Sequence, residues 1–263
     1  MIKQLIGAAS RTIRGRPPQG TATAPAMSPA SAFPADVSRE EEEIWRAVRP
    51  YTMTSLERVV SLVRAVQYVV HYGIQGAFVE CGVWRGGSMM AVAFALRKAG
   101  VTDRDIYLFD TYSGMPDARD LDIDANGRKA AELLSELRKL PEQDKVESDV
   151  LAQCSLEVTR RNVLSTGYPE ARIHLVQGSV ETTIPVHAPE AIALLRLDTD
   201  WYESTRHELV HLFPRVVRAG VLIIDDYGHW NGAKTAVDEY FQHTEEPIFF
   251  SRVDYTARLA IRQ

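Results

Sequence analysis

Five acidic residues of this 263-residue chain close short apolar runs that are typical of buried β-strands. They are Glu80, Asp110, Asp198, Asp225 and Asp226. Short apolar strands that alternate with helices predict a parallel sheet, and such sheets bind ligands beyond the carboxyl ends of their strands. Because five carboxylates at one edge exceed what a fold needs, we expect this edge to hold the functional site.

Asp198, Asp225 and Asp226 are the sharpest candidates for chemistry. We expect the two strands that they follow to be neighbours, about 4.8 Å apart. Three carboxylates at such a short separation repel one another unless a cation or protons lie between them. All-oxygen ligation without cysteine or histidine suits a hard cation such as Mg²⁺. The alternative is simple helix capping, with Asp200 or Ser204 before one helix and Asp225 or Asp226 before the next.

A glycine-rich turn follows the first strand, at residues 80–88 (E-C-G-V-W-R-G-G-S). Glycine lets the backbone turn sharply and approach a ligand closely. The spacing differs from the dinucleotide pattern G-x-G-x-x-G. The carboxylate of Glu80 can accept hydrogen bonds from a cationic ammonium group, whereas it would repel a pyrophosphate. The turn therefore favours S-adenosylmethionine over NAD, and taken alone it is a weak signal.

Asp110 closes the second strand. A carboxylate at that place can accept both ribose hydroxyls of an adenosine. NAD sites use the same contact, so Asp110 indicates a nucleoside without naming the cofactor. The alternative is an aspartate that only forms the turn before Thr111 and Ser113.

Aromatic and histidine residues lie close to the acidic motifs in the sequence. Stacking on a sugar or aromatic acceptor and packing in the core are both open for the four aromatic residues. These four are Trp201, Tyr202, Tyr227 and Trp230. His229 follows the acidic pair and is a candidate to line the site. His207 and His211 lie a helix turn or more from the strand ends, so we interpret them as helix-surface residues.

The elements that position these residues follow from apolar periodicity and turn signals. A helix is predicted after the capping-box pattern of Thr54 and Glu57, with Gly73 at its end. The predicted strands are 77–81, 106–109, 173–176, 192–197 and 221–224, with closing strands at 248–250 and 257–261. The predicted helices between them are 88–98, 203–217 and 232–241.

Together these elements predict an α/β fold with a doubly wound, mostly parallel, Rossmann-like sheet. Residues 117–170 are too long for a βα connection and carry charged helical segments at 130–140 and 155–165. We interpret this stretch as a helical insertion that acts as a lid. The folded domain is expected to span residues 39–263.

Residues 1–38 differ in composition from the rest of the chain. Their first part is basic, with apolar residues on one helical face, and residues 17–34 are rich in proline, alanine, serine and threonine. A membrane-surface helix or an organelle presequence would fit the basic part. A flexible tail is the favoured interpretation.

Composition excludes several classes of partner. The net charge of −5 argues against nucleic acid, and no apolar run is long enough to span a bilayer. Cys81 and Cys154 make neither a disulfide framework nor a zinc cluster, so a reducing, cytoplasmic setting is expected. The oligomeric state stays open, a homo-oligomer included.

Five segments resemble the macrocin O-methyltransferase family, which includes mycinamicin and novobiocin sugar methyltransferases. They are residues 51–54 (Y-T-M-T), 79–88, 108–116 (L-F-D-T-Y-S-G-M-P), 197–204 (L-D-T-D-W-Y-E-S) and 224–240. The last two motifs are specific. The resemblance extends from about residue 45 to the C-terminus, and the tail before Ser38 is expected to lie outside it.

The resemblance implies a class I methyltransferase that uses S-adenosylmethionine and Mg²⁺ to methylate a hydroxyl of a small molecule. The implied acceptor is a deoxysugar of a natural product or a surface glycan. The implied metal ligands are Asp198, Asp225 and Asp226. The cofactor residues that we assign are Thr52, Met53, Glu80, Gly82, Trp84, Gly86, Ser88, Asp110, Thr111 and Ser179. Asp198 or Asp200 is implied as the general base, and Asp200 is favoured because metal ligation would weaken the basicity of Asp198.

Three other functions remain open at this point. A methyltransferase for catechol-like phenols would use the same metal ligands, since two adjacent oxygens can chelate Mg²⁺. A nicotinamide-dependent oxidoreductase would share the strand-end carboxylate. A nucleotide-binding module without catalysis would keep both features.

Overall fold

The computed structural model describes residues 33–140, 151–244 and 246–263, and residues 36–263 form one compact unit. The expectations for the basic and proline-rich parts of the tail fall on residues outside the described ones. Within the described residues, no helix combines the length and apolar character that crossing a membrane requires.

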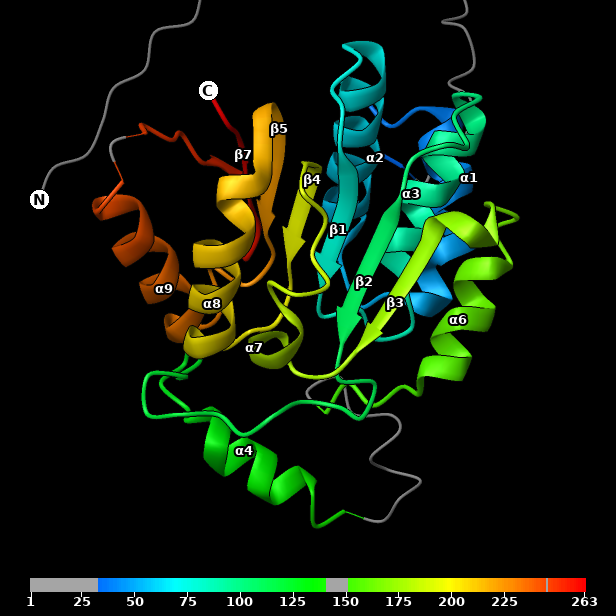
Figure 1. Ribbon diagram of the computed structural model, residues 1–263. Helices are drawn as coiled ribbons and strands as arrows, with labels where there is room; N and C mark the ends of the chain where they lie inside the picture. The colour runs from blue at the N-terminus through cyan, green and yellow to red at the C-terminus, as the bar shows by residue number, and fades with distance from the viewer. Residues whose placement is uncertain (1–32, 141–150, 245) are drawn as a thin grey trace, which may run out of the picture. The chain divides into compact units, whose positions relative to one another are not determined.

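A mostly parallel sheet forms the centre of this unit, in the order β3-β2-β1-β4-β5-β7-β6 (Figure 1). The strands are β1 (Ala77–Cys81), β2 (Ile106–Asp110), β3 (Ile173–Gln177), β4 (Ile192–Leu197), β5 (Val216–Ile224), β6 (Ser251–Arg252) and β7 (Arg258–Ile261). Strands β1 to β5 pair in parallel, and β7 returns antiparallel beside β5. The chain order reverses between β1 and β4, and ligands bind at such a reversal. The predicted α/β class is confirmed.

Helices cover both faces of the sheet (Figure 1). The α-helices are α1 (Arg39–Val48), α2 (Leu56–His71), α3 (Gly87–Lys98), α4 (Ala130–Leu137), α6 (Leu156–Leu164), α7 (Val180–Thr183), α8 (Tyr202–Leu212) and α9 (Asn231–Gln242). Short 3₁₀ turns are η1 (Arg49–Tyr51), η2 (Glu170–Arg172) and η3 (Phe213–Arg215).

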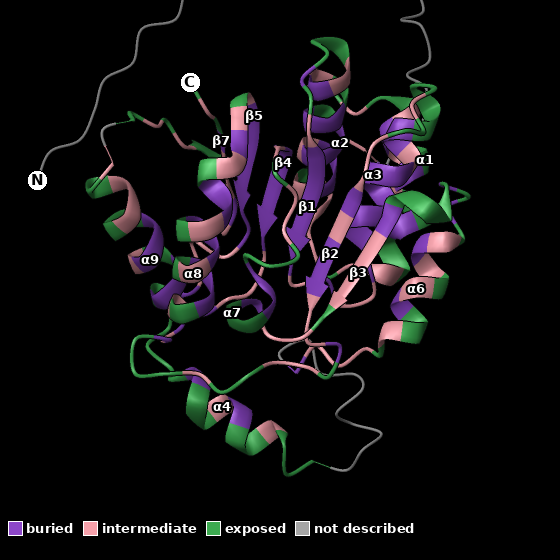
Figure 2. Ribbon diagram, in the orientation of Figure 1, coloured by how far each residue is buried: buried purple, intermediate pink, exposed green. Residues whose placement is uncertain are grey.

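Alternate residues of β1 explain why both faces need a cover. Phe78 packs in the apolar cluster shared with α2, α3 and α6, whereas Val79 packs in the cluster shared with α8 and α9. All five residues of β1 and all six of β4 are buried, as the purple strands in Figure 2 show. A strand buried on both faces is a continuous apolar run rather than an alternating one.

The first two described helices depart from the sequence prediction. Helix α2 begins after Ser55, whose side chain accepts the backbone N–H of Arg58, so the capping box predicted at Thr54 and Glu57 is wrong. A capping box does occur earlier, at Ser38 and Glu41, where it starts α1. No helix was predicted from the sequence at the position of α1.

Two other predicted boundaries are also wrong. The helix predicted to reach residue 217 ends at Leu212, where the 3₁₀ turn η3 follows; Pro214 in that turn lacks the backbone N–H that a continuing helix would use. Val216 then begins β5, which continues past Ala219 at a positive φ of 63°. The strand predicted at 248–250 is absent from that described segment, where pairing begins only at Ser251.

The stretch interpreted as a lid divides into two parts in space. Helix α6 contacts α3 and β3, so it belongs to the layer that flanks the sheet. Helix α4 lies beyond the carboxyl ends of the strands (Figure 1). Its residues Ala130 and Leu134 pack in one apolar cluster with Trp201 and Trp230. The segment that leads into α4 therefore borders the site.

Candidate active site

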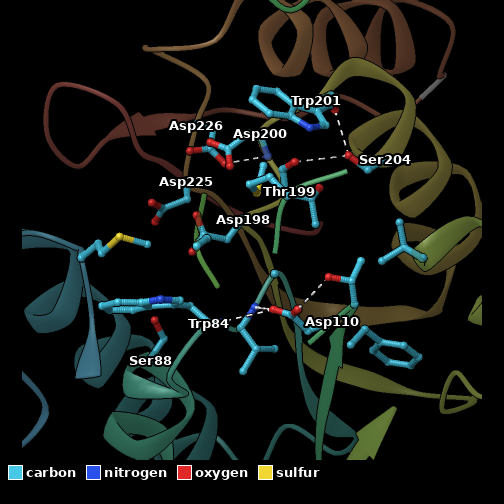
Figure 3. A pocket seen from close by; sticks show the side chains of 18 of the residues that line it. Trp84, Ser88, Asp110, Asp198, Thr199, Asp200, Trp201, Ser204, Asp225 and Asp226 are labelled. Atoms are coloured by element: carbon cyan, nitrogen blue, oxygen red, sulfur yellow. Dashed lines mark hydrogen bonds between the residues drawn. The ribbon is translucent and has the colours of Figure 1, made fainter. Parts of the chain in front are cut away.

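A cavity opens at the carboxyl ends of the strands, between β1 and β2 on one side and β4 and β5 on the other. Of the predicted site residues, Thr52, Met53, Gly82, Trp84, Ser88, Asp110, Thr111, Ser179, Asp198, Asp200, Asp225 and Asp226 line it. Figure 3 shows the acidic residues of the β4–β5 side facing Trp84, Ser88 and Asp110 across the pocket.

The glycine turn after β1 needs its glycines for close packing. A Cβ on Gly82 would stand 1.9 Å from the carbonyl oxygen of Asp198, so only glycine lets this turn meet the end of β4. Trp84 has a positive φ of 48° and lines the cavity. Gly86 lies outside the cavity, and a Cβ there would stand 2.8 Å from a methyl carbon of Val163 on α6. Gly86 therefore has a packing role, and the cofactor contact assigned to it stays a prediction from the sequence.

Glu80 is the second assigned residue that the structure does not bring to the cavity. Its side chain is fully buried, and its Oε1 lies 2.5 Å from Nη1 of Arg196. Burial raises the pKa of the Glu80 carboxyl to about 7, and the Arg196 charge acts in the opposite direction. Arg196 engages one oxygen of this buried carboxylate and Glu80 does not line the cavity, so the Glu80–ammonium contact stays a prediction from the sequence.

The side chain of Asp110 holds the glycine turn by accepting hydrogen bonds from the backbone of that turn. Its Oδ2 accepts the N–H groups of Val83 at 2.6 Å and Trp84 at 2.9 Å. Its Oδ1 accepts the N–H of Tyr112 at 2.7 Å. The turn-forming role that the sequence left open is therefore present. Since Asp110 also lines the cavity, a ribose contact stays compatible with it.

The three aspartates of the predicted metal site do lie together. The strands before them pair in parallel, with Leu197 opposite Ile224, as expected. One oxygen from each of Asp198, Asp225 and Asp226 lies within 4.8 Å of the others. Their separation and all-oxygen chemistry suit a hard divalent cation.

Two arginines that the sequence analysis missed approach these aspartates. Arg196 on β4 is 3% exposed and places Nη1 2.6 Å from Asp198 and Nη2 2.5 Å from Asp225. Arg58 on α2 forms an ion pair with the other oxygen of Asp225 and a second one with Asp254 at 3.0 Å. The signal for Arg196 was in the sequence, because a charged residue inside a buried apolar strand must be paired.

Negative charge remains in excess despite these arginines. Within the described residues of this cluster, two guanidinium groups meet six carboxylates: Glu80, Asp198, Asp200, Asp225, Asp226 and Asp254. Burial raises the pKa of Asp198 and Asp226 well above the usual range, with Coulomb repulsion from neighbouring aspartates adding to it. Burial also raises the pKa of Asp200, to about 6. Such a cluster has a strong affinity for a cation or for protons.

Helix capping does not explain the acidic motifs. Helix α8 begins after Trp201 and α9 after Trp230, and neither residue makes a side-chain capping bond. The backbone N–H of Asp200 donates to Oδ2 of Asp226 at 3.3 Å. Asp200 has a positive φ of 65°, an uncommon conformation that aspartate tolerates and that is enriched at functional sites.

The aromatic residues divide between core and cavity. Trp201 and Trp230 are 3% and 6% exposed and meet edge-to-face at 4.9 Å, and both also line the cavity. The hydroxyls of Tyr202 and Tyr227 donate to Glu239 and Asp238 on α9, away from the cavity. Trp201 and Trp230 therefore pack in the core and border the cavity, so both alternatives stay open for them, whereas Tyr202 and Tyr227 do not line the cavity.

The histidines lie where the sequence placed them. His229 lines the cavity. His207 and His211 lie on α8 with ring centroids 4.4 Å apart, and His207 Nε2 lies 3.0 Å from the carbonyl oxygen of Ile184. Neither His207 nor His211 lines the cavity.

This fold and this cavity are those of a class I methyltransferase. The family model described as Macrocin-O-methyltransferase (TylF) matches residues 21–260, and the chain belongs to that family. The match begins at residue 21, so the expectation that the family similarity excludes the tail before Ser38 is wrong. The chain is an S-adenosylmethionine-dependent O-methyltransferase, which decides against the oxidoreductase and the non-catalytic module.

Individual relatives agree with this assignment. The chain is similar to the demethyldecarbamoylnovobiocin O-methyltransferase of Streptomyces niveus, with 34% identity over 217 residues that cover 81% of this chain and 77% of the relative. It is similar to the mycinamicin III 3''-O-methyltransferase of Micromonospora griseorubida, with 30% identity over 190 residues that cover 72% and 70%. The solved structure of the O-methyltransferase NovP matches with a TM-score of 0.68 at 29% identity, covering 81% of this chain and 82% of that one.

Proposed function

We propose that this enzyme transfers the methyl group of S-adenosylmethionine to a hydroxyl of a sugar-bearing small molecule, with Mg²⁺ held by Asp198, Asp225 and Asp226. The observation that carries the metal assignment is the cluster itself. Its ligand oxygens lie within 4.8 Å of one another, and the surrounding arginines leave its negative charge in excess. A divalent cation would balance that charge and occupy the centre of the cluster.

The cofactor belongs on the opposite side of the cavity in this proposal. Trp84, Ser88 and Asp110 offer a ring face, a hydroxyl and a carboxylate on that side (Figure 3). Thr111 and Ser179 extend it along the ends of β2 and β3, and Thr52 and Met53 line it from the segment before α2. The sulfonium methyl would then face the acidic cluster across the pocket.

The reaction is an in-line displacement at the methyl carbon. The acceptor oxygen forms a bond to carbon, the C–S bond breaks, and sulfur keeps the electron pair. An alkyl hydroxyl is a poor nucleophile at neutral pH, and a bound Mg²⁺ supplies Lewis acidity that stabilises its developing negative charge. The chain must align the hydroxyl with the C–S bond and keep water away.

Asp200 is proposed as the general base. It lines the cavity two residues after Asp198, and its turn is fixed by the bond from its N–H to Asp226. Arg196 already engages Asp198, which leaves Asp198 suited to ligation rather than to proton transfer. Asp200 would accept the hydroxyl proton as the C–O bond forms.

A sugar acceptor is supported by the names of the relatives. Among them are a mycinamicin III 3''-O-methyltransferase and a tetracenomycin enzyme from Streptomyces olivaceus that acts on a rhamnosyl group, the latter 34% identical over 196 residues. A catechol-like phenol remains the alternative acceptor, because the same three aspartates would serve it.

The test is a methylation assay with and without metal. Demethyldecarbamoylnovobiocin, mycinamicin III and a simple catechol are incubated with the enzyme and S-adenosylmethionine, and products are identified by mass spectrometry. Turnover is expected on a sugar-bearing acceptor, to disappear in excess EDTA and to return with added Mg²⁺. Calorimetric binding of S-adenosylhomocysteine is expected to persist in EDTA, because the cofactor lies on the other side of the cavity.

Two outcomes would overturn parts of this proposal. Full turnover in excess EDTA, with no metal found by elemental analysis, would leave catalysis to the carboxylates alone. Methylation of catechol with none of any sugar-bearing acceptor would transfer the assignment to phenols.

A further inference from the structure

One buried carboxylate outside the acidic cluster has no role in the proposed reaction. Asp122 lies in the segment 116–130, which crosses the carboxyl edge before α4 and which we call the strap. Its side chain is fully buried, with 0% exposure. No lysine, arginine or histidine among the described residues forms an ion pair with it. A buried carboxylate of this kind needs another source of compensation.

The compensation comes from backbone N–H groups. Oδ2 of Asp122 accepts the N–H of Arg119 at 2.7 Å, within the strap. Oδ1 accepts the N–H of Tyr202 at 2.9 Å, and Tyr202 is the first residue of α8. Burial raises the pKa of Asp122, and these two backbone donors act in the opposite direction. Asp122 thus supplies the cap that α8 lacks from its own sequence.

The same oxygen meets the start of the other active-site helix. A Cβ on Gly232 would stand 2.0 Å from Oδ1 of Asp122, so a larger residue there would displace the carboxylate. Gly232 is the second residue of α9. Helix N-termini carry partial positive charge, so α8 and α9 both stabilise the anion that lies between them.

These two helices follow the two strands that carry the acidic cluster. Helix α8 starts two residues after Asp200, and α9 starts five residues after Asp226. The strap is also tied to both turns by backbone and ring contacts. The indole N–H of Trp201 donates to the carbonyl of Pro116 at 3.2 Å, and the N–H of Asn231 donates to that of Ile123 at 2.9 Å.

We propose that Asp122 is a positioning residue that joins the starts of α8 and α9 through one carboxylate and thereby sets the spacing of the acidic cluster. The part that concerns metal and acceptor rests on the proposed function. The structural part, that one side chain couples three segments, does not.

The chain offers a matched control in Asp124. It is 9% exposed and lies two residues further along the strap. Its Oδ1 accepts the N–H groups of Asn126 and Arg128, so its side-chain bonds stay within the local turn. Asp122→Asn and Asp124→Asn therefore make the same substitution in the same segment, but only the side chain of Asp122 accepts a hydrogen bond from α8.

The first measurement is hydrogen exchange on the full chain without metal or acceptor. Asp122→Asn is expected to speed exchange in the strap and at the starts of α8 and α9, whereas Asp124→Asn speeds it only within residues 124–128. The near-ultraviolet circular dichroism of the Trp201–Trp230 pair is expected to weaken in Asp122→Asn alone. Equal exchange and equal spectra in the two variants would overturn the coupling.

The second measurement separates positioning from general stability. Asp122→Asn is expected to weaken Mg²⁺ binding and to lower kcat/KM for the acceptor by about tenfold or more, the value of one charge-assisted hydrogen bond. S-adenosylhomocysteine affinity is expected to stay within about twofold, because its side of the cavity has no contact with Asp122. A parallel loss of cofactor affinity would show a merely structural role. If the unaltered enzyme binds no Mg²⁺ at all, the proposed function fails, while the exchange comparison still decides the coupling.

Discussion

The two sides of the active-site edge are built in different ways. On the β1–β2 side, Asp110 accepts N–H groups from Val83, Trp84 and Tyr112, so the glycine turn is held by backbone bonds within one βαβ unit. On the β4–β5 side, the acidic cluster depends on side chains from distant parts of the chain. Arg58 and Asp225 are 167 residues apart.

This difference means that the β1–β2 side is already satisfied by its own hydrogen bonds, whereas the β4–β5 side keeps unpaired negative charge. On the cofactor side, neutral backbone N–H groups satisfy the carboxylate of Asp110, so this carboxylate needs no positively charged partner. Two arginines satisfy the acidic cluster only in part, so it keeps an affinity for a cation. We expect substitutions on the acidic side to affect catalysis and stability more than those on the cofactor side.

Asp200→Asn should have the largest effect on turnover. Loss of a general base typically lowers kcat about 10²- to 10⁴-fold. Mg²⁺ affinity, measured by calorimetry, is expected to change little, since Asp200 is not a proposed ligand. Asp198→Asn serves as the contrast and should weaken Mg²⁺ binding, because one anionic ligand becomes neutral. Full turnover in Asp200→Asn would assign the base elsewhere.

Arg196→Met should have the largest effect on stability. It leaves Glu80 and Asp225 buried next to each other without the guanidinium between them, and breaking a buried pair in this way costs about 3–5 kcal/mol. Urea unfolding measures this loss. The matched control is Arg160→Met, which breaks the exposed pair with Glu170 and should cost no more than about 1 kcal/mol. Similar losses in the two variants would contradict the role given to Arg196.

Asp110→Ala should weaken S-adenosylhomocysteine binding about ten- to a hundredfold, equivalent to about 1.5–3 kcal/mol for a charge-assisted hydrogen bond. Part of that loss would come from the freed N–H groups of Val83 and Trp84. The control is Asp105→Ala, which precedes β2 at its opposite end and pairs with His174. Unchanged calorimetric affinity in a folded Asp110→Ala enzyme would remove Asp110 from the cofactor site.

Glu208→Gln should change the pH dependence of stability. Glu208 is fully buried beneath Thr199, whose hydroxyl donates to it at 3.0 Å, and burial raises its pKa well above the usual range. A carboxyl with a raised folded-state pKa takes up a proton on folding at any pH between its unfolded and folded pKa values. Its contribution to stability is therefore complete below the unfolded pKa of about 4.3 and declines as pH rises above it, by up to about 1.4 kcal/mol per unit.

The glutamine variant should lose this component of the pH slope and gain stability relative to the natural chain at pH 8. Urea unfolding at several pH values above 5 measures the difference between the two proteins. Parallel curves would show that Glu208 is not held protonated in the folded state.

Much of the fold could be predicted because its signals are local. The strands at 77–81 and 192–197 were recognised from apolar runs bounded by turn residues, and both are confirmed at those limits. The helix after Glu203 was predicted too long, because Ala219-Gly220 gave a stronger stop signal than Pro214. The sequence pattern alone could not show that residues 216–224 pair as one strand beside β4 and β7.

The acidic cluster could be predicted for a similar reason. Strand ends at one edge of a parallel sheet must meet, so Asp198, Asp225 and Asp226 were brought together by the order of elements and one assumption about neighbouring strands. No comparable rule predicts which residues pair with these aspartates. Arg58 lies on a helix that packs against the sheet, and nothing in its own segment indicates a contact with Asp225.

By itself the sequence determined which residues end the strands, where the glycine turn lies and that carboxylates gather at one edge, because these follow from periodicity and short-range geometry. Only the tertiary structure decided that Glu80 lies beneath Arg196, that Gly86 packs on α6 and that Asp122 meets Tyr202 and Gly232. Asp122 and Tyr202 are 80 residues apart, and their contact depends on how the strap crosses the finished sheet. Contacts between residues so far apart in the sequence depend on the packing of the whole domain, so they cannot be predicted from local sequence patterns.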